Sequence, residues 1–539
     1  MQKVLTAEQM REVDRLTVEK YGIPFLLLME NAAHAAANVI KEKLGGSVAG
    51  KSFLILCGKG NNGGDGAALA RILWTQGAKV EVYSFVEVEK TKGEARTNFE
   101  ILENLSQNRD EENLNFTVDV EDCWVHSTGT ELDNFDVFVD ALFGSGLTKP
   151  ISSSLQNLPY IYSYQRENSR FPFFVSLDIP SGLNADLSEP IGENFQADLT
   201  ITFTAPKLAN VLPPASNFNG ELVTVNVGSP LELVDNCGSQ LYLTERSDAQ
   251  DWLSETAFKF DSYKKTRGHA LIIAGSKNMS GAAVLCADSA MQSGVGLVTI
   301  ATPDAAQTPV ASRVKPEIMV LGFDSTESGA ISETALQKVL DLSAKMNAVA
   351  IGCGLGSSEE TTRKFVRGFI ENRKTPVVID ADALNALAPF DLRGSDELPI
   401  ILTPHIGEMR RLLGVDETFD FTNRVSIVRE FAQKHHVILV LKGERALIAN
   451  EYGDVVINPT GNSGLGKAGN GDTLTGIICG FIAQTVANQR EPDIFQAVVA
   501  ALYIAGLAGD IAARNIGKRS MLASDVRESL REAFQSLEK

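Results

Sequence analysis

The stretch SFLILCGKGNNGGDGAALARILWTQGAKVEVYSF, residues 52–85, decides the fold of the first half of the chain. It opens on an apolar run, Ser52–Cys57, which predicts a buried strand, and glycine-rich residues 58–66 then predict a loop. Residues 67–76 predict a helix and residues 79–85 a second strand. Strands and helices that alternate in this order favour a parallel sheet with helices on its faces.

The alternation extends from this stretch toward both ends of the chain. Thr6 and Gln9 form a capping-box signature, which predicts a helix near the N-terminus. Further buried strands are predicted at residues 136–141, 173–177, 199–203, 270–274, 297–301, 348–351, 377–379, 400–402 and 437–441. A polar stretch near residue 235 interrupts the series, so we expect two α/β domains, residues 1–230 and residues 240–539.

Charge and cysteine usage exclude several classes of function. The formal net charge is −19, and the densest basic stretch, residues 263–267, is too short to attract nucleic acid or an anionic membrane. The six cysteines lie far apart, without the spacing of zinc ligands. Because the sequence also has no signal pattern and no apolar run of transmembrane length, we expect a cytoplasmic protein with no nucleic-acid or membrane partner.

Three predicted strand ends carry polar groups that suit a ligand site. The glycines at 58, 60 and 63 fit a dinucleotide turn with Glu81 in the next strand, so a dehydrogenase is one interpretation. Asn62, Asp140 and Ser181 follow three different strands, whose carboxyl ends meet at one edge of a parallel sheet. Their oxygen atoms suit a hard cation such as K⁺ or Mg²⁺, although each residue alone is also an ordinary turn former.

Residues 1–228 closely resemble the NAD(P)H-hydrate epimerases. The resemblance lies in residues 28–33 (LMENAA), 60–66 (GNNGGDG), 140–146, 178–183 and 206–207. It implies a Rossmann-like parallel-sheet sandwich, K⁺ held by Asn62, Asp140 and Ser181, and proton transfer by Asp178 during epimerisation. The implied substrate contacts are Asn61, Asn62, Gly63, Gly64, Asp65, Gly144, Ser145, Gly146, Leu147, Thr148, Lys149, Pro150 and Asp178.

The second half of the chain carries its densest glycine cluster at residues 458–476. Gly466 and Lys467 come close to a phosphate-binding P-loop, but Ala468 stands where a Mg²⁺-ligating hydroxyl is required, so we reject that motif. Residues 468–472 instead open an apolar helix predicted at 473–483, and their backbone N–H groups suit an anion hole for a phosphoryl group. Asp472, which we expect to be ionised by the helix dipole, would act as base; the alternative is an ordinary glycine-rich helix cap.

From about residue 242 to residue 525 the chain resembles the ADP/ATP-dependent NAD(P)H-hydrate dehydratases of the ribokinase-like superfamily. The matching motifs include residues 267–269, 274–276, 280–283, 294–298, 352–356, 380–385, 403–408, 441–444 and 508–510. The resemblance implies a ribokinase-like α/β/α sandwich, Mg²⁺ with ADP, and conversion of ADP to AMP and phosphate. Three residues depart from the family pattern, namely Tyr263, Lys467 and Asn470, and a bulky Lys467 could alter nucleotide preference.

The dehydratase resemblance also implies two sets of ligand contacts. The nucleotide contacts are Lys442, Gly443, Glu444, Arg445, Ala446 and Gly471. The contacts to the hydrated nicotinamide are Ala282, Gly356, His405 and Asp472. His435 and His436 fit a plain helix end and receive no role.

The combined prediction is a two-domain enzyme that repairs hydrated nicotinamide cofactors. The first domain would interconvert the R and S forms of NADHX and NADPHX, and the second would dehydrate the S form with ADP. We expect small-molecule partners only, and a homo-oligomer. The alternatives are a vitamin-precursor or sugar kinase with an unrelated N-terminal domain, a dehydrogenase, and a nucleotide-binding scaffold without turnover.

Overall fold

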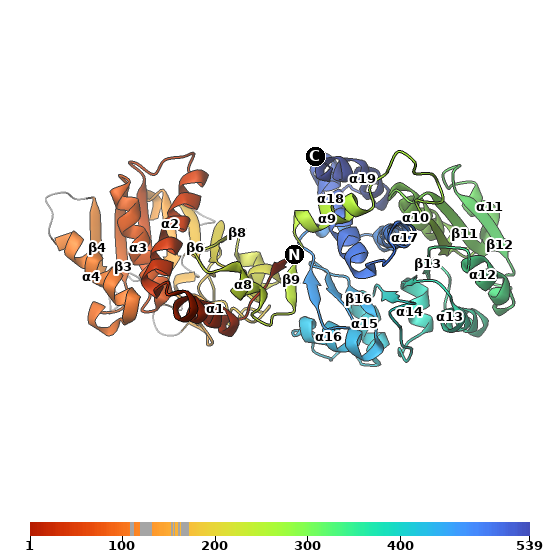
Figure 1. Cartoon of the computed structure of the whole chain (residues 1–539), viewed down its shortest axis with the longest axis horizontal. Helices are drawn as coiled ribbons and strands as arrows, with labels where there is room; N and C mark the ends of the chain where they lie inside the picture. Colours follow the sequence, from red (N-terminus) through yellow and green to blue (C-terminus); the bar gives the residue numbers. More distant parts are fainter. Residues whose placement is uncertain are drawn as a thin grey trace. The chain divides into compact units, whose positions relative to one another are not determined.

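The computed structural model describes residues 1–107, 113–118, 132–151, 155, 157–159, 162 and 172–538. The chain divides into two compact units, which Figure 1 shows as two helix-covered sheets. One unit is residues 3–239, and the other joins residues 240–539 with Met1 and Gln2. Both sheets are largely parallel, so the predicted α/β fold with two parallel-sheet domains is confirmed. Residues 231–239, which neither predicted domain includes, group with the N-terminal unit.

The N-terminal unit is built on a seven-stranded sheet with the order β4-β3-β2-β5-β6-β7-β8. All six pairs of neighbouring strands are parallel. The strands are β2 (Ser52–Cys57), β3 (Lys79–Ser84), β4 (Leu114–Val118), β5 (Val137–Ala141), β6 (Phe173–Leu177), β7 (Leu199–Phe203) and β8 (Glu221–Val225). The side chains of β5 are buried on both faces, as the continuous apolar run predicts.

The principal helices of this unit are α1 (Ala7–Tyr21), α2 (Phe25–Lys43), α3 (Asn61–Thr75), α4 (Gly93–Gln107), α7 (Leu208–Val211) and α8 (Leu231–Asp235). The predicted capping box of Thr6 and Gln9 is present at the start of α1. The predicted loop at 58–66 is wrong from Asn61 onward, because α3 already begins at that residue. A Cβ at Gly63 would overlap the backbone oxygen of Gly58, so glycine lets the helix start this close to β2.

The C-terminal unit is built on an 11-stranded sheet with the order β1-β9-β18-β17-β16-β15-β14-β13-β10-β11-β12. From β9 to β12 the neighbouring strands are parallel, except for the two pairs that β17 forms, which are antiparallel. The strands are β1 (Gln2–Lys3), β9 (Leu241–Leu243), β10 (His269–Ile273), β11 (Leu297–Pro303), β12 (Met319–Phe323), β13 (Ala348–Ile351), β14 (Val377–Ile379), β15 (Ile400–Leu402), β16 (Ile438–Leu441), β17 (Leu447–Ala449) and β18 (Val455–Ile457).

The helices of this unit are α9 (Arg246–Glu255), α10 (Ser280–Gln292), α11 (Asp304–Ala311), α12 (Leu336–Ser343), α13 (Glu360–Asn372), α14 (Ala381–Ala386), α15 (Ile406–Leu413), α16 (Arg424–His435), α17 (Asn470–Asn488), α18 (Ile494–Ile516) and α19 (Ala523–Leu537). The helix predicted at 473–483 is longer at both ends than expected. A Cβ at Gly476 would overlap the backbone oxygen of Cys286, so α17 and α10 pack with their backbones nearly in contact. The rings of Trp252 and Phe481 stack 3.9 Å apart in the same core.

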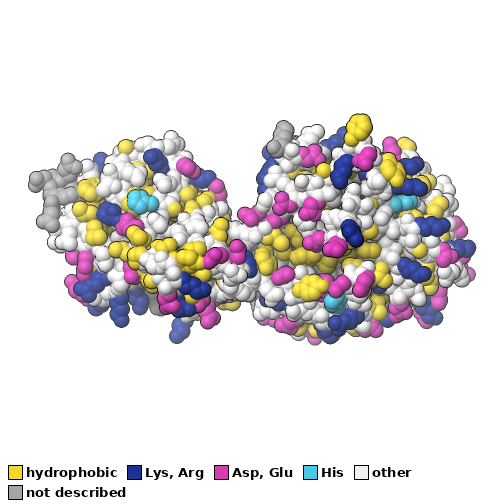
Figure 2. Space-filling view, viewed as in Figure 1, with side chains coloured by type: hydrophobic (Ala, Val, Ile, Leu, Met, Phe, Trp, Pro, Cys, Tyr) yellow, Lys and Arg dark blue, Asp and Glu magenta, His cyan; other side chains and the backbone are white. Residues whose placement is uncertain are grey.

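Two features bear on the predicted partners. Helix α18 is long and apolar enough to cross a membrane by length and composition, but 67% of its most apolar window is buried inside the protein, as in a core helix. On the face drawn in Figure 2, basic and acidic side chains lie interspersed rather than gathered by sign.

Candidate active sites

The first candidate site lies where β2, β5 and β6 end side by side. Asp140, at the end of β5, is fully buried and accepts hydrogen bonds from the Ser181 hydroxyl at 2.6 Å and the Ser181 amide at 2.8 Å. The Ser176 hydroxyl donates a further hydrogen bond at 3.0 Å. Burial raises the pKa of Asp140, and the hydrogen bonds from Ser181 oppose that rise. The structure therefore brings two of the three predicted cation ligands into direct contact.

Asn62, the third predicted ligand, is buried in the first turn of α3. Among the residues that the structure describes, neither its amide nitrogen nor its amide oxygen has a hydrogen-bond partner. A Cβ at Gly144 would lie 3.3 Å from the Cβ of Asn62 and 3.0 Å from Oδ2 of Asp178, so these three residues adjoin. A buried amide without a partner is costly, so this amide is available to a water, an ion or a substrate that enters the site.

Asp178 is held by the buried Lys207, a residue to which its sequence motif assigns no role. The Nζ atom of Lys207, which is 1% exposed, lies 2.6 Å from Oδ1 of Asp178. The backbone amide of Ser145 donates to Oδ2 at 2.9 Å, so both carboxylate oxygens are engaged. Asp178 also has a φ of 65°, a strained conformation for a non-glycine residue. Such strain and burial around one carboxylate are typical of an active site.

Two further carboxylates lie in the electrostatic field of Asp178. Burial raises the pKa of Asp65 well above its usual range, and the charges of Asp178 and Asp14 raise it further. Burial also raises the pKa of Asp14 to about 6, although the charge of Lys207 opposes the rise. Asp14 lies on α1, far from the glycine motifs, which is why no sequence pattern singles it out.

The other predicted epimerase contacts fall into a buried group and a more exposed group. Residues 62–66 are buried, whereas Asn61 is exposed. In the loop after β5, Gly144, Ser145 and Leu147 are half-buried. Gly146, Thr148, Lys149 and Pro150 are exposed. A substrate could therefore contact the exposed loop while its reacting part lies near Asp178.

The second candidate site lies at the start of α17. Gly469 caps the helix with a φ of 90°, which glycine adopts without strain, and Asp472 follows in the first turn. Burial raises the pKa of Asp472 to about 6; a hydrogen bond with Cys353 opposes the rise, and the charge of Asp380 adds to it. The start of α17 favours the ionised carboxylate, but burial still raises the pKa of Asp472 above its ordinary value. A carboxylate with this pKa is still suited to act as a base near neutral pH.

Lys442 faces this helix start from the end of β16. Its Nζ atom lies 2.7 Å from Oδ1 of Asp380 and 3.9 Å from Oε2 of Glu408. Burial lowers the pKa of Lys442, but the two carboxylates outweigh burial and the pKa is raised overall. A Cβ at Gly471 would lie 3.6 Å from Nζ, so the ammonium group stands beside the predicted anion hole.

The remaining predicted nucleotide contacts form the turn between β16 and β17. Gly443 and Glu444 are exposed, and Arg445 and Ala446 are half-buried. Burial lowers the pKa of Arg445. The turn therefore begins directly after Lys442, and its first two residues are exposed to solvent.

The predicted contacts to the hydrated ring come from different elements of the same unit: Ala282 lies in the first turn of α10, Asp472 in the first turn of α17, His405 at the N-cap of α15 and Gly356 in a loop. A Cβ at Gly354 would lie 2.9 Å from the Cβ of Ala282, which places Ala282 beside the loop that contains Gly356. His405 caps α15: its Nδ1 accepts from the Gly407 amide at 3.0 Å, and its own amide donates to Glu408 at 2.9 Å. The exposed ring of His405 therefore has a local structural role as well as the predicted one.

The side chain of Lys467, which departs from the family pattern, is fixed by hydrogen bonds to the backbone. Its Nζ atom donates to the carbonyl oxygens of Met521, at 2.9 Å, and Arg519. The side chain is thereby committed to the segment before α19. This arrangement gives the bulky residue a structural reason that the sequence alone does not reveal.

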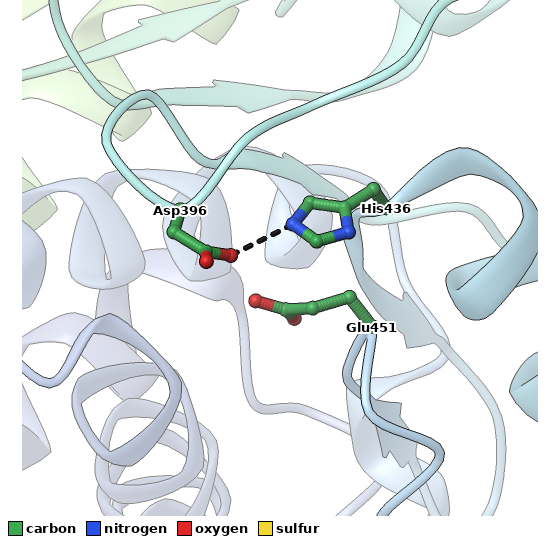
Figure 3. Close-up of side chains that lie close together, drawn as sticks. All are labelled: Asp396, His436 and Glu451. Carbon is green, nitrogen blue, oxygen red and sulfur yellow. Dashed lines mark hydrogen bonds and ion pairs between the residues drawn. The ribbon is translucent and has the colours of Figure 1, made fainter.

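A second group of possible metal ligands lies apart from both sites. Figure 3 shows Asp396, His436 and Glu451, whose ligand atoms lie within 4.8 Å of one another. Nε2 of His436 and Oδ1 of Asp396 are 2.7 Å apart. His436 caps the end of α16, as the sequence predicts for a plain helix end. We assign this group no function, because its hydrogen bonds and exposure fit a surface ion pair.

Two different family models match the chain, one in each of its two units. A family model described as "YjeF-related protein N-terminus" matches residues 26–209, and one described as "NAD(P)H-hydrate dehydratase" matches residues 270–532. A crystal structure of an ADP/ATP-dependent NAD(P)H-hydrate dehydratase from Bacillus subtilis, co-crystallised with ATP and Mg²⁺, is 30% identical. That match covers 55% of this chain and 98% of the other, with a TM-score of 0.47.

Curated relatives match the chain over its whole length. The bifunctional NAD(P)H-hydrate repair enzyme Nnr of Moorella thermoacetica is 36% identical over 99% of this chain and 97% of its own length. The protein of the same name from Thermofilum pendens is 32% identical, again over 99% of this chain and 97% of its own length. The chain therefore belongs to the family of bifunctional NAD(P)H-hydrate repair enzymes.

Proposed function

We propose that the chain repairs hydrated NADH and NADPH in two steps, with one step in each unit. The observation that carries the proposal is that each unit places one aspartate of its family motif in a partly buried polar site, Asp178 in the first and Asp472 in the second. The N-terminal unit would interconvert the R and S hydrates. The C-terminal unit would convert the S hydrate to the reduced cofactor with ADP as phosphoryl donor.

In the first unit we assign proton transfer to Asp178. Lys207 fixes Oδ1, and the Ser145 amide fixes Oδ2, so the carboxylate is oriented before substrate arrives. The proposed substrate contacts are those predicted from the sequence, in the loops at 61–65 and 144–150. The unpartnered amide of Asn62, with Asp140 and Ser181, fits a K⁺ ion, which would order these loops.

In the second unit we assign the base to Asp472. The hydroxyl oxygen of the S hydrate attacks the terminal phosphoryl group of ADP, its proton passes to Asp472, and AMP leaves. The ring nitrogen then expels phosphate as the carbon–oxygen bond breaks, and loss of a proton from the adjacent carbon restores the dihydropyridine. Because phosphate leaves more readily than hydroxide, the phosphorylation drives the dehydration.

The charged groups around Asp472 support this assignment. Lys442 and the N–H groups at the start of α17 would neutralise negative charge on the phosphoryl group in transit. The buried carboxylate of Glu408 lies near Lys442 and would offer an oxygen ligand for Mg²⁺ bound to the nucleotide. We retain Ala282, Gly356 and His405 as contacts to the hydrate and the turn at 443–446 as a nucleotide contact. A cytoplasmic location and a homo-oligomer also remain predictions.

The test is recovery of the reduced-nicotinamide absorbance band from a mixture of R and S NADHX, with the full chain, ADP, Mg²⁺ and K⁺. We expect full recovery with the wild type, recovery of only the S share with Asp178→Ala, and none with Asp472→Ala. The two variants serve as controls for each other, because each leaves the other unit intact. No recovery with either ADP or ATP would contradict the proposal.

The alternatives predict different products in the same experiment. A vitamin-precursor or sugar kinase would release a stable phosphorylated product instead of reduced cofactor. A dehydrogenase would transfer hydride to or from an alcohol without nucleotide. A scaffold would bind cofactor without turnover, and replacing Asp178 would leave that function unchanged.

A further inference from the structure

Two aspartates separated by one residue, Asp380 and Asp382, contact different segments of the second site. Asp380 and Asp382 stand at the junction of β14 and α14. Asp380 is 1% exposed, and its Oδ1 accepts from Lys442 Nζ at 2.7 Å. Its Oδ2 accepts from the Thr475 hydroxyl, also at 2.7 Å. Asp380 therefore joins the lysine beside the anion hole to the helix that forms the anion hole.

Asp382 holds a different loop. Its Oδ2 accepts from the backbone amide of Gly356 at 2.8 Å, and the Ser357 hydroxyl lies 3.4 Å from Oδ1. Gly356 has a φ of 76°, so the loop after β13 makes a tight turn at the point where Asp382 fixes it. This loop carries a proposed contact to the hydrated ring, whereas Lys442 belongs to the nucleotide side.

The backbone between the two carboxylates is strained. Ala381 has a φ of 49°, in the left-handed region, which is unfavourable for a residue with a Cβ. Tight packing keeps this turn in place, because a Cβ at Gly352 would overlap the backbone oxygen of Asp380. Strain of this kind persists where the surrounding structure imposes it, most often at functional sites.

The carboxylate of Asp380 does not act as a helix cap. Asp380 occupies the N-cap position of α14, where an aspartate usually accepts from the helix amides, yet its side chain makes no capping hydrogen bond. Both of its oxygens are instead used across the site. A residue chosen only to start α14 would not need these two long-range contacts, to residues 62 and 95 positions away.

We propose that Asp380 and Asp382 are positioning residues that divide the second site, with Asp380 fixing the nucleotide side and Asp382 fixing the hydrate side. Asp380 would act through Lys442 and Thr475, which lie at the phosphoryl group. Asp382 would act through Gly356, which lies at the nicotinamide. The inference rests on the proposed dehydratase function and specifies which ligand each carboxylate serves.

The test is steady-state kinetics of the full chain with S-NADHX and Mg·ADP, each varied while the other is saturating. Asp380→Asn removes a charge-assisted contact to Lys442, so we expect the KM for ADP to rise about 10- to 100-fold with a much smaller change in the KM for S-NADHX. Asp382→Asn should do the reverse. The two variants are matched, because each replaces one carboxylate oxygen by an NH2 group and the two positions are separated by one residue.

A pH profile separates positioning from a general loss of structure. The groups that act on Asp472 are Cys353, Asp380, Lys442 and Asp382. Asp380→Asn removes a negative charge that raises the pKa of Asp472, so the acid limb of the rate should move to lower pH. If both variants raise both KM values equally and leave the acid limb in place, the division of the site is overturned.

Two further measurements keep the inference testable if a variant or the proposed function fails. Should Asp380→Asn not fold, Thr475→Val removes only the second contact of the carboxylate and should still raise the KM for ADP alone. Should the wild type bind ADP but not regenerate NADH, the proposed function fails. Calorimetric ADP affinity then decides the nucleotide half of the inference, which requires weaker binding by Asp380→Asn and unchanged binding by Asp382→Asn. A wild type that does not bind ADP would overturn the inference.

Discussion

The two units place a lysine–aspartate pair at the ends of parallel strands, but they use it differently. In the N-terminal unit Lys207 pairs with Asp178, which is also the proposed catalytic group. In the C-terminal unit Lys442 pairs with Asp380, and the proposed base, Asp472, lies beside the pair. The distances are nearly equal, 2.6 Å and 2.7 Å, so the difference lies in the choice of partner.

The difference follows from what each reaction asks of its aspartate. An aspartate that is paired with a buried lysine is fixed in place, which suits repeated proton transfer at one ring carbon. A base that must take up a hydroxyl proton near neutral pH benefits from a raised pKa, and burial without a direct cation partner supplies it. A lysine–aspartate pair can therefore include the proposed catalytic aspartate, as in the first unit. It can also exclude it and leave the lysine to bind phosphate, as we propose for the second unit.

The largest expected effect comes from breaking the buried pair in the first unit. Lys207→Met should lower the epimerisation rate by about 100-fold or more, because Asp178 loses its orienting partner. It should also lower the free energy of unfolding by about 3–5 kcal/mol, since a carboxylate is left unpaired in a buried site. Epimerisation by chiral chromatography and denaturant unfolding of the full chain measure the two effects.

The double variant Asp178→Asn with Lys207→Met is the control for this comparison. It removes both charges, so we expect most of the lost stability to return, while epimerisation is lost together with the Asp178 carboxylate. Lys442→Met in the second unit should destabilise less, because the Lys442 side chain is 21% exposed against 1% for Lys207. Epimerisation within threefold of wild type in Lys207→Met would refute the assigned role.

The next largest effects come from replacing one glycine at the start of α3 and one at the start of α17 by alanine. Gly63→Ala forces a Cβ into the backbone oxygen of Gly58 and should destabilise the N-terminal unit by about 1–3 kcal/mol or more. Gly471→Ala meets Lys442 and Asp380 only at ordinary distances, 3.6 Å and 3.7 Å, so the fold should be retained. It should instead raise the KM for ADP, because the added methyl group stands beside the phosphoryl site. Melting curves and ADP titrations distinguish the two outcomes.

The raised pKa of Asp472 predicts that the ionised carboxylate needed for catalysis lowers the free energy of unfolding at neutral pH. Burial favours the neutral acid, so the folded chain loses stability as the pH rises from the ordinary pKa of 3.8 through about 6. Asp472→Asn should therefore stabilise the protein at neutral pH, by at most about 3 kcal/mol, and the gain should vanish below about pH 4. Unfolding of wild type and variant at pH 4 and pH 7.5 is the measurement; a variant less stable at both would contradict the prediction.

The pH dependence of turnover should reflect the same group. Below a pH of about 6 the dehydratase kcat/KM should fall about tenfold per pH unit, because only ionised Asp472 accepts the proton. Cys353→Ala removes a hydrogen bond that lowers the pKa of Asp472, so its acid limb should move to higher pH. Cys237→Ala, which alters a thiol of the other unit, is the control and should leave the profile unchanged.

The smallest expected effect concerns Lys467. Since its Nζ atom is held by the carbonyl oxygens of Arg519 and Met521, the lysine has little freedom to contact nucleotide. Lys467→Ser should change the ratio of ADP to ATP turnover by less than about threefold, equivalent to less than about 1 kcal/mol. Competition between the two nucleotides at equal concentration measures this ratio, and a larger change would restore Lys467 as a determinant of preference.

Local sequence patterns predicted much of the fold and the outline of both sites. The capping box of Thr6 and the buried strand Ser52–Cys57 are recognisable because each depends on a few neighbouring residues. Helix starts inside glycine-rich stretches were less predictable. Asn61 and Asn470 begin helices earlier than expected, because close packing against a neighbouring segment, and not residue propensity, decides where these helices start.

The sequence by itself determined the alternation of strands and helices, the family and the set of chemically able residues, since periodicity and motifs are local properties of the chain. Only the tertiary structure decided which aspartate pairs with which lysine, that His405 caps α15 and that the pKa of Asp472 is raised. Asp380 and Lys442 are 62 residues apart, and the order of β14, β15 and β16 in the sheet brings them together. Pairing and desolvation depend on distances through space and on burial, which no local pattern records.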